Sequence, residues 1–180
     1  CGNGWGVKCL KDKYSYGLAD GLGHGPDAGI GAQAALSMAR EHRDKAPAEI
    51  IERAHGALRS TRGAALAVAE IDAARQLLRF CGVGNIAATI VNNLGMRHLI
   101  SYNGIVGQEA RKIAEMTYPW SSDSLLIMHS DGLSTRWDLA SYPALLQRHP
   151  ALTAAVLYRD FSRGRDDSTV LVSGENVART

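Results

Sequence analysis

The stretch that decides the fold is residues 17–25, which read G-L-A-D-G-L-G-H-G and join a short strand-like run to a long helical pattern. Asp20 falls where the strand should end. The glycines that follow it, Gly21, Gly23 and Gly25, let the backbone turn tightly and approach a ligand closely. A carboxylate at a strand end beside bare backbone can hold a hard cation or lie next to a bound phosphate. We therefore expect a binding site at this strand-to-helix junction.

Two further acidic turns occur much later in the chain. Asp131 lies in H-S-D-G, and Asp166 and Asp167 lie in G-R-D-D-S-T, each beside a predicted strand. We expect these turns to meet Asp20 in space. Because several carboxylates repel one another unless cations lie between them, the set predicts a metal site. For Asp131 alone, an ordinary Asp-Gly turn is the alternative interpretation.

The ligand types select the metal. Carboxylate oxygens suit Mg²⁺ or Mn²⁺, whereas zinc would require His or Cys at close spacing, which the six histidines do not show. Two such ions roughly 3.5–4 Å apart can share a water, lower its pKa and position a phosphoryl group for in-line attack. The pattern therefore predicts hydrolysis of a phosphate ester.

Composition limits the alternatives. A length of 180 residues predicts one domain, residues 1–180, and 46% apolar with 21% charged residues is typical of a soluble globular protein. A net charge of +2 with scattered arginines gives no case for nucleic acid. Three cysteines without a CxxC pair indicate a reducing, cytoplasmic location, and no run is long enough to span a membrane. Since the chain begins at Cys1, upstream residues are expected.

The order of predicted elements indicates the α+β class. Residues 5–9 and 14–19 read as a hairpin. Two helices follow, each begun by a proline, at about 26–42 and from 47 to about 60. An antiparallel meander, two more strands, two helices and a closing strand complete the chain. The ranges are 64–71, 77–83, 86–91 and 96–100 for the meander, 111–118 and 125–129 for the next strands, 142–146 and 152–161 for the helices, and 168–172 for the last strand. Helices and strands in separate blocks favour antiparallel sheets covered by helices.

Three motifs in this order resemble one protein family. G-L-A-D-G-L-G-H-G-P, H-S-D-G-L and G-R-D-D-S-T-V-L-V resemble the metal-dependent type-2C (PPM) Ser/Thr protein phosphatases, in particular the bacterial SpoIIE-like branch. The C-G-N-G-W opening and the stretch Y-R-D-F-S-R-G-R-D-D are most similar to the RsbX-type phosphatases of stressosomes. The resemblance spans nearly the whole chain.

The resemblance implies an αββα sandwich of two antiparallel sheets, with two Mn²⁺ or Mg²⁺ ions in a cleft at the sheet edges. Asp20 would bridge both ions and the Gly21 carbonyl would bind one. Asp131, Asp166 and Asp167 would complete the site. The implied substrate is a phosphoserine or phosphothreonine on a bacterial signalling partner, a stressosome or anti-anti-sigma protein with a STAS-type domain.

Several positions depart from the family pattern. Asn3 and Asn85 stand where relatives carry metal-binding aspartates, so at most two ions are expected and one of them is weakly held. His24 is a candidate proton donor to the leaving serine. Arg136, with Trp137, is a candidate substrate lip, although a buried anchor for the loop is an equal alternative for Trp137.

Two other functions compete with the phosphatase. The two asparagines motivate a pseudophosphatase, a binding regulator with a vestigial metal site. Residues 23–28 also match a dinucleotide fingerprint, G-x-G-x-x-A. Pro26 argues against a dinucleotide, because it removes an N–H group that a pyrophosphate would need. The chain that follows is also a meander rather than a crossover to a parallel strand.

Overall fold

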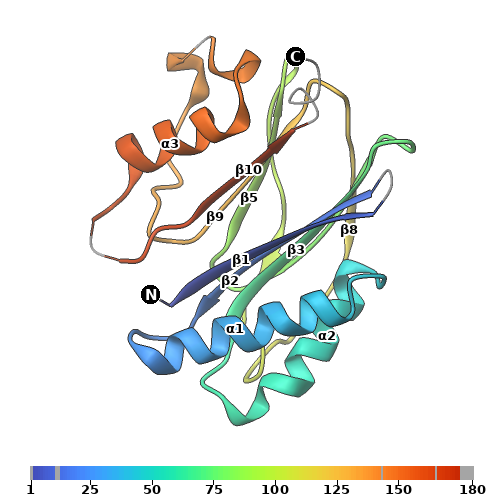
Figure 1. Ribbon diagram of the computed structural model, residues 1–180, viewed down its shortest axis with the longest axis vertical. Coiled ribbons are helices and arrows are strands. Elements are labelled where there is room, and N and C mark those ends of the chain that lie inside the picture. The colour runs from blue at the N-terminus through green and yellow to red at the C-terminus, as the bar shows by residue number, and fades with distance from the viewer. Residues whose placement is uncertain (1, 11–12, 143, 165, 175–180) are drawn as a thin grey trace.

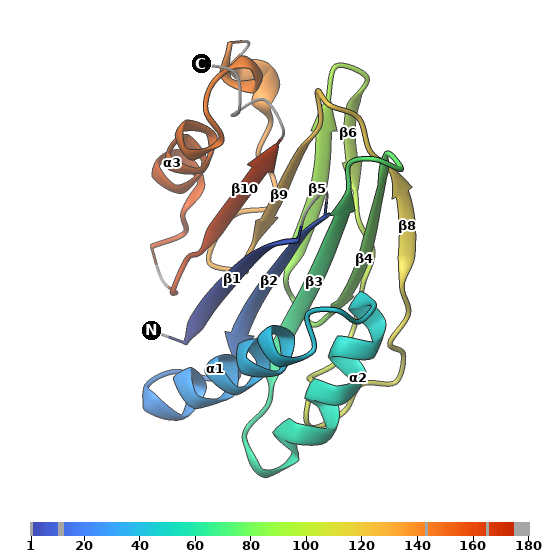
Figure 2. The same ribbon diagram turned by 45° about the vertical axis from the view of Figure 1, so that its right-hand side comes forward.

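The chain folds into two β-sheets packed face to face, with helices covering the outer face of each (Figures 1 and 2). The structure is a computed structural model that describes residues 2–10, 13–142, 144–164 and 166–174. Helices α1 (Pro26–Glu41) and α2 (Pro47–Ala57) lie against the first sheet, and α3 (Pro150–Phe161) lies against the second. The predicted αββα sandwich of the α+β class is confirmed.

The first sheet has the strand order β1-β2-β3-β4-β7, and β8 also pairs with β4. Its strands are β1 (Asn3–Leu10), β2 (Lys13–Gly21), β3 (Ala64–Asp72), β4 (Leu77–Val83), β7 (Ser101–Tyr102) and β8 (Met116–Pro119). The pairings β1–β2, β2–β3 and β3–β4 are all antiparallel, as the predicted opening hairpin requires. In this register Asn3 lies opposite Asp20, which places both at the same end of the sheet.

The second sheet has the strand order β10-β9-β5-β6, with every pairing antiparallel. Its strands are β5 (Ala87–Asn92), β6 (Gly95–His98), β9 (Leu125–His129) and β10 (Val170–Gly174). Strands β9 and β10 carry the acidic turns at neighbouring ends, because Asp131 follows β9 and Asp166 precedes β10. Antiparallel pairing of these two strands therefore brings two distant acidic turns together.

The main core lies between the sheets. Because side chains alternate across a strand, Tyr16 and Leu18 of β2 face the second sheet while Ala19 faces the helices. Leu126 and Met128 of β9 fill the same central layer from the other side. Two further apolar layers lie under α1 and α2 and under α3. Three buried layers fix how the two sheets sit relative to each other.

The helices begin where the sequence predicts. Pro26 and Pro47 occupy the first turns of α1 and α2, where a missing N–H costs nothing, and Asp27 and Glu49 add acidic charge there. Neither these helices nor any other in the described part of the chain is long and apolar enough to cross a membrane. Cys9 is exposed and Cys81 is buried.

The structure corrects three predicted elements. The strands at 64–100 are not one meander, because the chain passes from the first sheet to the second after β4. Gly84, at φ 99°, turns the backbone there and packs against Ala65. The helix expected at 142–146 is wrong. One 3-10 turn (Leu139–Ser141) precedes this range and a second (Leu145–Gln147) overlaps its end; Pro143, which has no N–H, lies outside the described residues. The strand expected at 111–118 is shorter in the structure, where only β8 (Met116–Pro119) is a strand.

Two helical glycines give a matched test of packing. A Cβ at Gly31 of α1 would lie 2.7 Å from the Gly63 carbonyl oxygen, whereas a Cβ at Gly56 of α2 would meet nothing within 4 Å. We expect Gly31→Ala to lower the free energy of unfolding by about 1–3 kcal/mol through overpacking. We expect Gly56→Ala to raise it by about 0.5–1 kcal/mol through helix propensity. Urea denaturation measures both; equal effects of the same sign would contradict the packing of α1 against the Gly63 turn.

Candidate metal centre

The three acidic turns line one cavity. Asp20, Asp131 and Asp166 surround a space of about 770 Å³ at the sheet ends, together with Gly21, His24 and Asn85. These residues come from the end of β2, the turn after β4, the turn after β9 and the loop before β10. The structure thus brings together the residues that the sequence predicts to meet.

Glycines allow the acidic turns to approach so closely. A Cβ at Gly21 would overlap the carbonyl of Ala28, so the beginning of α1 can lie against the strand end only if residue 21 has no side chain. A Cβ at Gly132 would overlap the carbonyl of Asp167 in the same way. In both Asp-Gly pairs the glycine is needed for contact between distant segments. The interpretation of Asp131-Gly132 as an ordinary local turn is therefore insufficient.

The electrostatics of Asp20 indicate which kind of ligand would suit the cavity. Burial, together with the charges of Asp131, Asp166 and Asp167, raises the pKa of Asp20 to about 7. Asp20 lies on the same strand face as Leu18, so the apolar layer between the sheets limits its hydration. A carboxylate held among other carboxylates is ionised at neutral pH only at a cost in free energy. A divalent cation in the cavity would reverse that cost.

Asp131 gives a second indication that the cavity suits a cation. Its Oδ2 accepts a hydrogen bond from Asn85 Nδ2, while its buried Oδ1 has no partner among the described residues. A buried carboxylate oxygen without a partner is costly in a folded protein. Cation coordination at this oxygen would satisfy it.

The donor set fits a hard, well-hydrated cation. The cavity offers carboxylate oxygens and the backbone of Gly21, and oxygen ligands suit Mg²⁺ and Mn²⁺. Within the part of the chain that the structure describes, no group of three or more His, Cys, Asp or Glu side chains is placed to hold a metal ion by itself. Mg²⁺ commonly binds through one or two carboxylates and keeps several waters, so an incomplete protein cage suits this ion.

Asp167 and Asn3 form a brace beside the cavity. The Asp167 carboxylate accepts a hydrogen bond from the Gly2 backbone N–H at 2.7 Å, and Asp167 is absent from the cavity lining. Asn3 Nδ2 donates to Ser130 Oγ at 2.9 Å and to the Asp167 carbonyl at 3.0 Å. The structure therefore gives Asp167, predicted as a metal ligand, a contact to the beginning of β1. The Asn3 amide ties β1 to the two later acidic turns.

His24 and Arg136 lie differently with respect to the cavity. His24 is exposed and lines the cavity, where a proton donor would be needed. Arg136 is exposed but does not line the cavity. Trp137 is only 5% exposed, and its indole N–H donates to His129 Nε2 at 3.2 Å. Trp137 therefore anchors its loop, and the predicted substrate lip is wrong for this residue.

Buried His129 supports this anchor as a neutral ring. Its Nδ1 is 2.9 Å from the Ser130 carbonyl, and burial lowers its pKa. A neutral ring that donates from Nδ1 can accept the Trp137 N–H at Nε2. The second histidine near the centre is thus a structural residue, as the sequence suggests for a histidine inside a strand.

Sequence reasoning missed several residues of the site. Residues 103–105 line the wall of the cavity, and the sequence motifs did not mark them as part of the site. Ser130 accepts from Asn3 and from the Thr169 N–H at 3.0 Å, so it joins β1, β9 and β10. Its position next to Asp131 in H-S-D-G is the only signal that could have found it.

Comparison with known proteins identifies the family. The chain matches the family described as Stage II sporulation protein E (SpoIIE) over residues 11–174. This chain belongs to the SpoIIE family. "Phosphoserine phosphatase RsbX" of Bacillus subtilis (strain 168) is 25% identical to it over 135 residues, which cover 74% of this chain and 68% of the relative.

Solved structures share the fold of this SpoIIE-family chain. A chain from "The bacterial stressosome: a modular system that has been adapted to control secondary messenger signaling" has a TM-score of 0.86 at 25% identity, over 96% of this chain and 90% of that one. RsbX in complex with magnesium has a TM-score of 0.83 at 22% identity, over 96% and 85%. The PP2C phosphatase domain of SpoIIE from Bacillus subtilis has a TM-score of 0.77 at 22% identity, over 95% and 57%. The predicted family, fold and phosphatase class are confirmed.

The centre predicts a metal-dependent change in stability. At about one hundred times its Kd, Mn²⁺ or Mg²⁺ should raise the free energy of unfolding by about 2.7 kcal/mol, which raises Tm by roughly 5–10 °C. Asp20→Asn should abolish this gain. In chelator at pH 8 the same variant should melt above the parent chain, because it removes a carboxylate whose ionisation is disfavoured there. Differential scanning calorimetry measures both effects.

Asp138→Asn is the matched control for this experiment. Asp138 is exposed and caps a 3-10 turn through the Ala140 N–H, a hydrogen bond that Asn can also accept. The Asp138→Asn variant should gain as much Tm from Mn²⁺ or Mg²⁺ as the parent chain does. Equal stabilisation of Asp20→Asn and the parent chain by Mn²⁺ would mean that the ion binds elsewhere.

Proposed function

We propose that this chain is a metal-dependent phosphatase that hydrolyses phosphoserine or phosphothreonine on a bacterial signalling protein. The observation that carries the proposal is the convergence of Asp20, Asp131 and Asp166 on one cavity, where the pKa of Asp20 is raised to about 7. A site built this way is adapted to a divalent cation, and the relatives are phosphatases. Asp20 and the Gly21 carbonyl, with Asp131 and Asp166, are the proposed ligands.

Bound Mg²⁺ or Mn²⁺ would supply Lewis acidity, which lowers the pKa of a water and neutralises charge on a phosphate ester. The chain's own residues supply the geometry. Asn85 donates to Asp131 Oδ2, which restrains that carboxylate and leaves Oδ1 without a protein hydrogen bond, so Oδ1 would be available to hold the ion. The brace of Asn3, Ser130 and Asp167 holds the turn of Asp166 against β1. Preorganised groups of this kind lower the cost of stabilising charge in the transition state.

His24 is the proposed general acid. It belongs to the glycine-rich turn after Asp20 and lines the same cavity. Glycines at 23 and 25, with φ of 89° and 81°, give this turn a backbone that other residues rarely adopt. From this place the imidazole can deliver a proton to the serine or threonine oxygen that leaves the phosphate.

The partner is proposed from the comparisons and the shape of the site. The cavity is open to solvent along residues 22–24 and residues 103–105, so a phosphorylated side chain of a folded protein can enter it. One relative is named a phosphoserine phosphatase and one similar chain comes from a stressosome study. A phosphorylated STAS-domain protein of a stressosome or anti-anti-sigma type is therefore the proposed substrate.

The test measures phosphate release from a phosphoserine peptide and from a phosphorylated STAS-domain protein, with Mn²⁺, with Mg²⁺ and with chelator. We expect turnover with metal only, a loss of at least about 100-fold in kcat for Asp131→Asn, and full activity for Asp138→Asn. Metal binding by calorimetry without turnover on either substrate would overturn the enzyme and favour a pseudophosphatase. Turnover that survives chelation would overturn the metal-dependent mechanism.

A further inference from the structure

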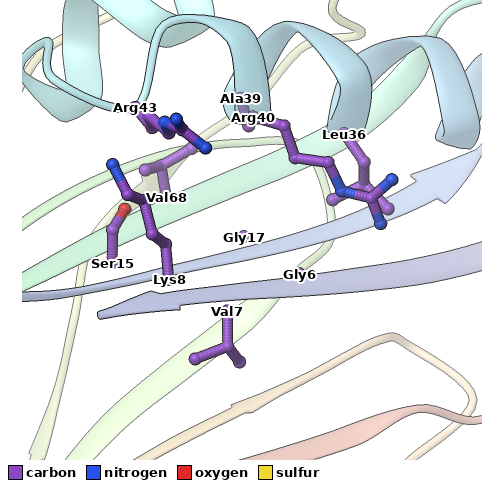
Figure 3. Close-up of a pocket in the computed structure, with 10 residues that line it drawn as sticks. All are labelled: Gly6, Val7, Lys8, Ser15, Gly17, Leu36, Ala39, Arg40, Arg43 and Val68. Atoms are coloured by element: carbon purple, nitrogen blue, oxygen red, sulfur yellow. The ribbon is translucent and has the colours of Figure 1, made fainter. Parts of the chain in front are cut away.

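A second cavity lies between the first sheet and the last turns of α1. It has a volume of about 270 Å³ and is lined by β1, β2, β3 and the α1 segment (Figure 3). Its floor is bare backbone at Gly6 and Gly17. A Cβ at Gly17 would lie 3.4 Å from Leu36 Cδ2, and one at Gly6 would lie 3.9 Å from Arg40 Nε. Glycines here let α1 approach the strands while leaving room beside Arg40.

Three cationic side chains surround this floor. Lys8 extends from β1, and Arg40 and Arg43 extend from α1 and the turn after it. Figure 3 shows Lys8 and Arg43 at one end of the cavity beside Ser15, with Arg40 at the other end. Across the described ranges, no hydrogen bond or ion pair involves any of these three cations, and the cavity lining contains no carboxylate. The cavity therefore concentrates positive charge without an internal counter-ion.

An acidic residue, Asp44, acts on Lys8 from outside the cavity lining. Burial and the charge of Arg43 lower the pKa of Lys8, while Asp44 opposes this effect. Asp44 lies outside the lining and is 3.9 Å from Lys45 Nζ. The α1 dipole explains basic residues near its C-terminus. It does not explain Lys8, which reaches the same cavity from a strand.

We propose that this cavity binds a phosphate dianion at a site separate from the metal centre. The Arg43 guanidinium, the Lys8 ammonium and the Ser15 hydroxyl lie together at one end of the cavity, where they can donate to the terminal oxygens of one anion, and Arg40 adds positive charge from the other end. Lys8 lies five residues along β1 from Asn3, a separation of about 17 Å at the usual rise of a strand. One substrate phosphate therefore cannot occupy both places.

The walls of the cavity leave room for more than the phosphate alone. Leu36, Ala39 and Val68 form an apolar side next to the cations. The phosphate can therefore be a phosphorylated side chain of a protein, with its carbon atoms on this side, or it can be free inorganic phosphate. Both sources present the same dianion to Lys8 and Arg43.

The test is calorimetric titration of the intact chain with inorganic phosphate and with a phosphoserine peptide, in chelator and at constant ionic strength. Chelation leaves the metal centre as a set of carboxylates that repel phosphate. We expect one bound phosphate per chain. Lys8→Gln with Arg43→Gln should weaken binding by about tenfold or more, because charge-assisted hydrogen bonds are lost. Arg40→Gln alone is a second variant, which should weaken phosphate binding by a smaller factor.

The control carries the same change in charge elsewhere. Arg59 and Arg148 are exposed arginines outside the cavity, and Arg59→Gln with Arg148→Gln should leave the affinity unchanged. Tighter binding of the peptide than of phosphate assigns a protein source, and equal binding assigns free phosphate. Absence of binding by both probes, or equal weakening in the two double variants, would overturn the site. Neither result depends on phosphatase activity, so this proposal and the proposed function fail separately.

Discussion

Repulsion among carboxylates at Asp20 is the constraint on which the organisation of this protein depends. Folding brings the charges of Asp131, Asp166 and Asp167 near a carboxylate that is already partly removed from water, and the pKa of Asp20 rises to about 7. The free energy for this arrangement comes from apolar packing elsewhere, chiefly the layer between the two sheets. The fold thus holds acidic groups whose repulsion is relieved by a proton on Asp20 at lower pH or by a bound cation at neutral pH.

Glycine backbone and asparagine amide groups hold the acidic turns in place against the repulsion between their carboxylates. Gly21 and Gly132 permit contacts that any side chain would block. Asn3 and Asn85 use amide N–H groups, which an aspartate lacks, to donate to neighbouring groups of the acidic turns. The two asparagines look like lost metal ligands in sequence, yet in the structure they hold the remaining acids in place. Their presence is therefore compatible with an active centre.

The sequence predicts those residues of the metal centre that belong to short local motifs. Asp20, Asp131 and Asp166 each stand in a glycine-rich or doubled-acid turn beside a strand, so their types and order predict a common cavity. The brace through Gly2, Ser130 and the Asp167 carboxylate escaped prediction, because it depends on which way side chains point at the ends of antiparallel strands. The passage between sheets at Gly84 was missed for a similar reason. Local apolar runs do not say which sheet a strand joins.

The basic cavity was even harder to predict from the sequence than the metal centre. In sequence the arginines look scattered, and Lys8 is far along the chain from Arg40 and Arg43. Packing of α1 across β1 and β2 gathers them around a glycine floor (Figure 3). Periodicity correctly predicts α1 and the hairpin as separate elements. The charge cluster arises only from their relative placement, so the same chain carries an acidic centre and a basic cavity along one strand.

The most direct test of the central claim is the location of bound manganese in crystals, by anomalous scattering after Mn²⁺ is added. The account predicts an anomalous peak in the cavity with carboxylate oxygens of Asp20 and of Asp131 or Asp166 at about 2.0–2.3 Å, typical of a small hard cation. It also predicts a partner for Asp131 Oδ1. An anomalous map with no peak in this cavity at saturating Mn²⁺, or with the ion held by other residues, would contradict the account.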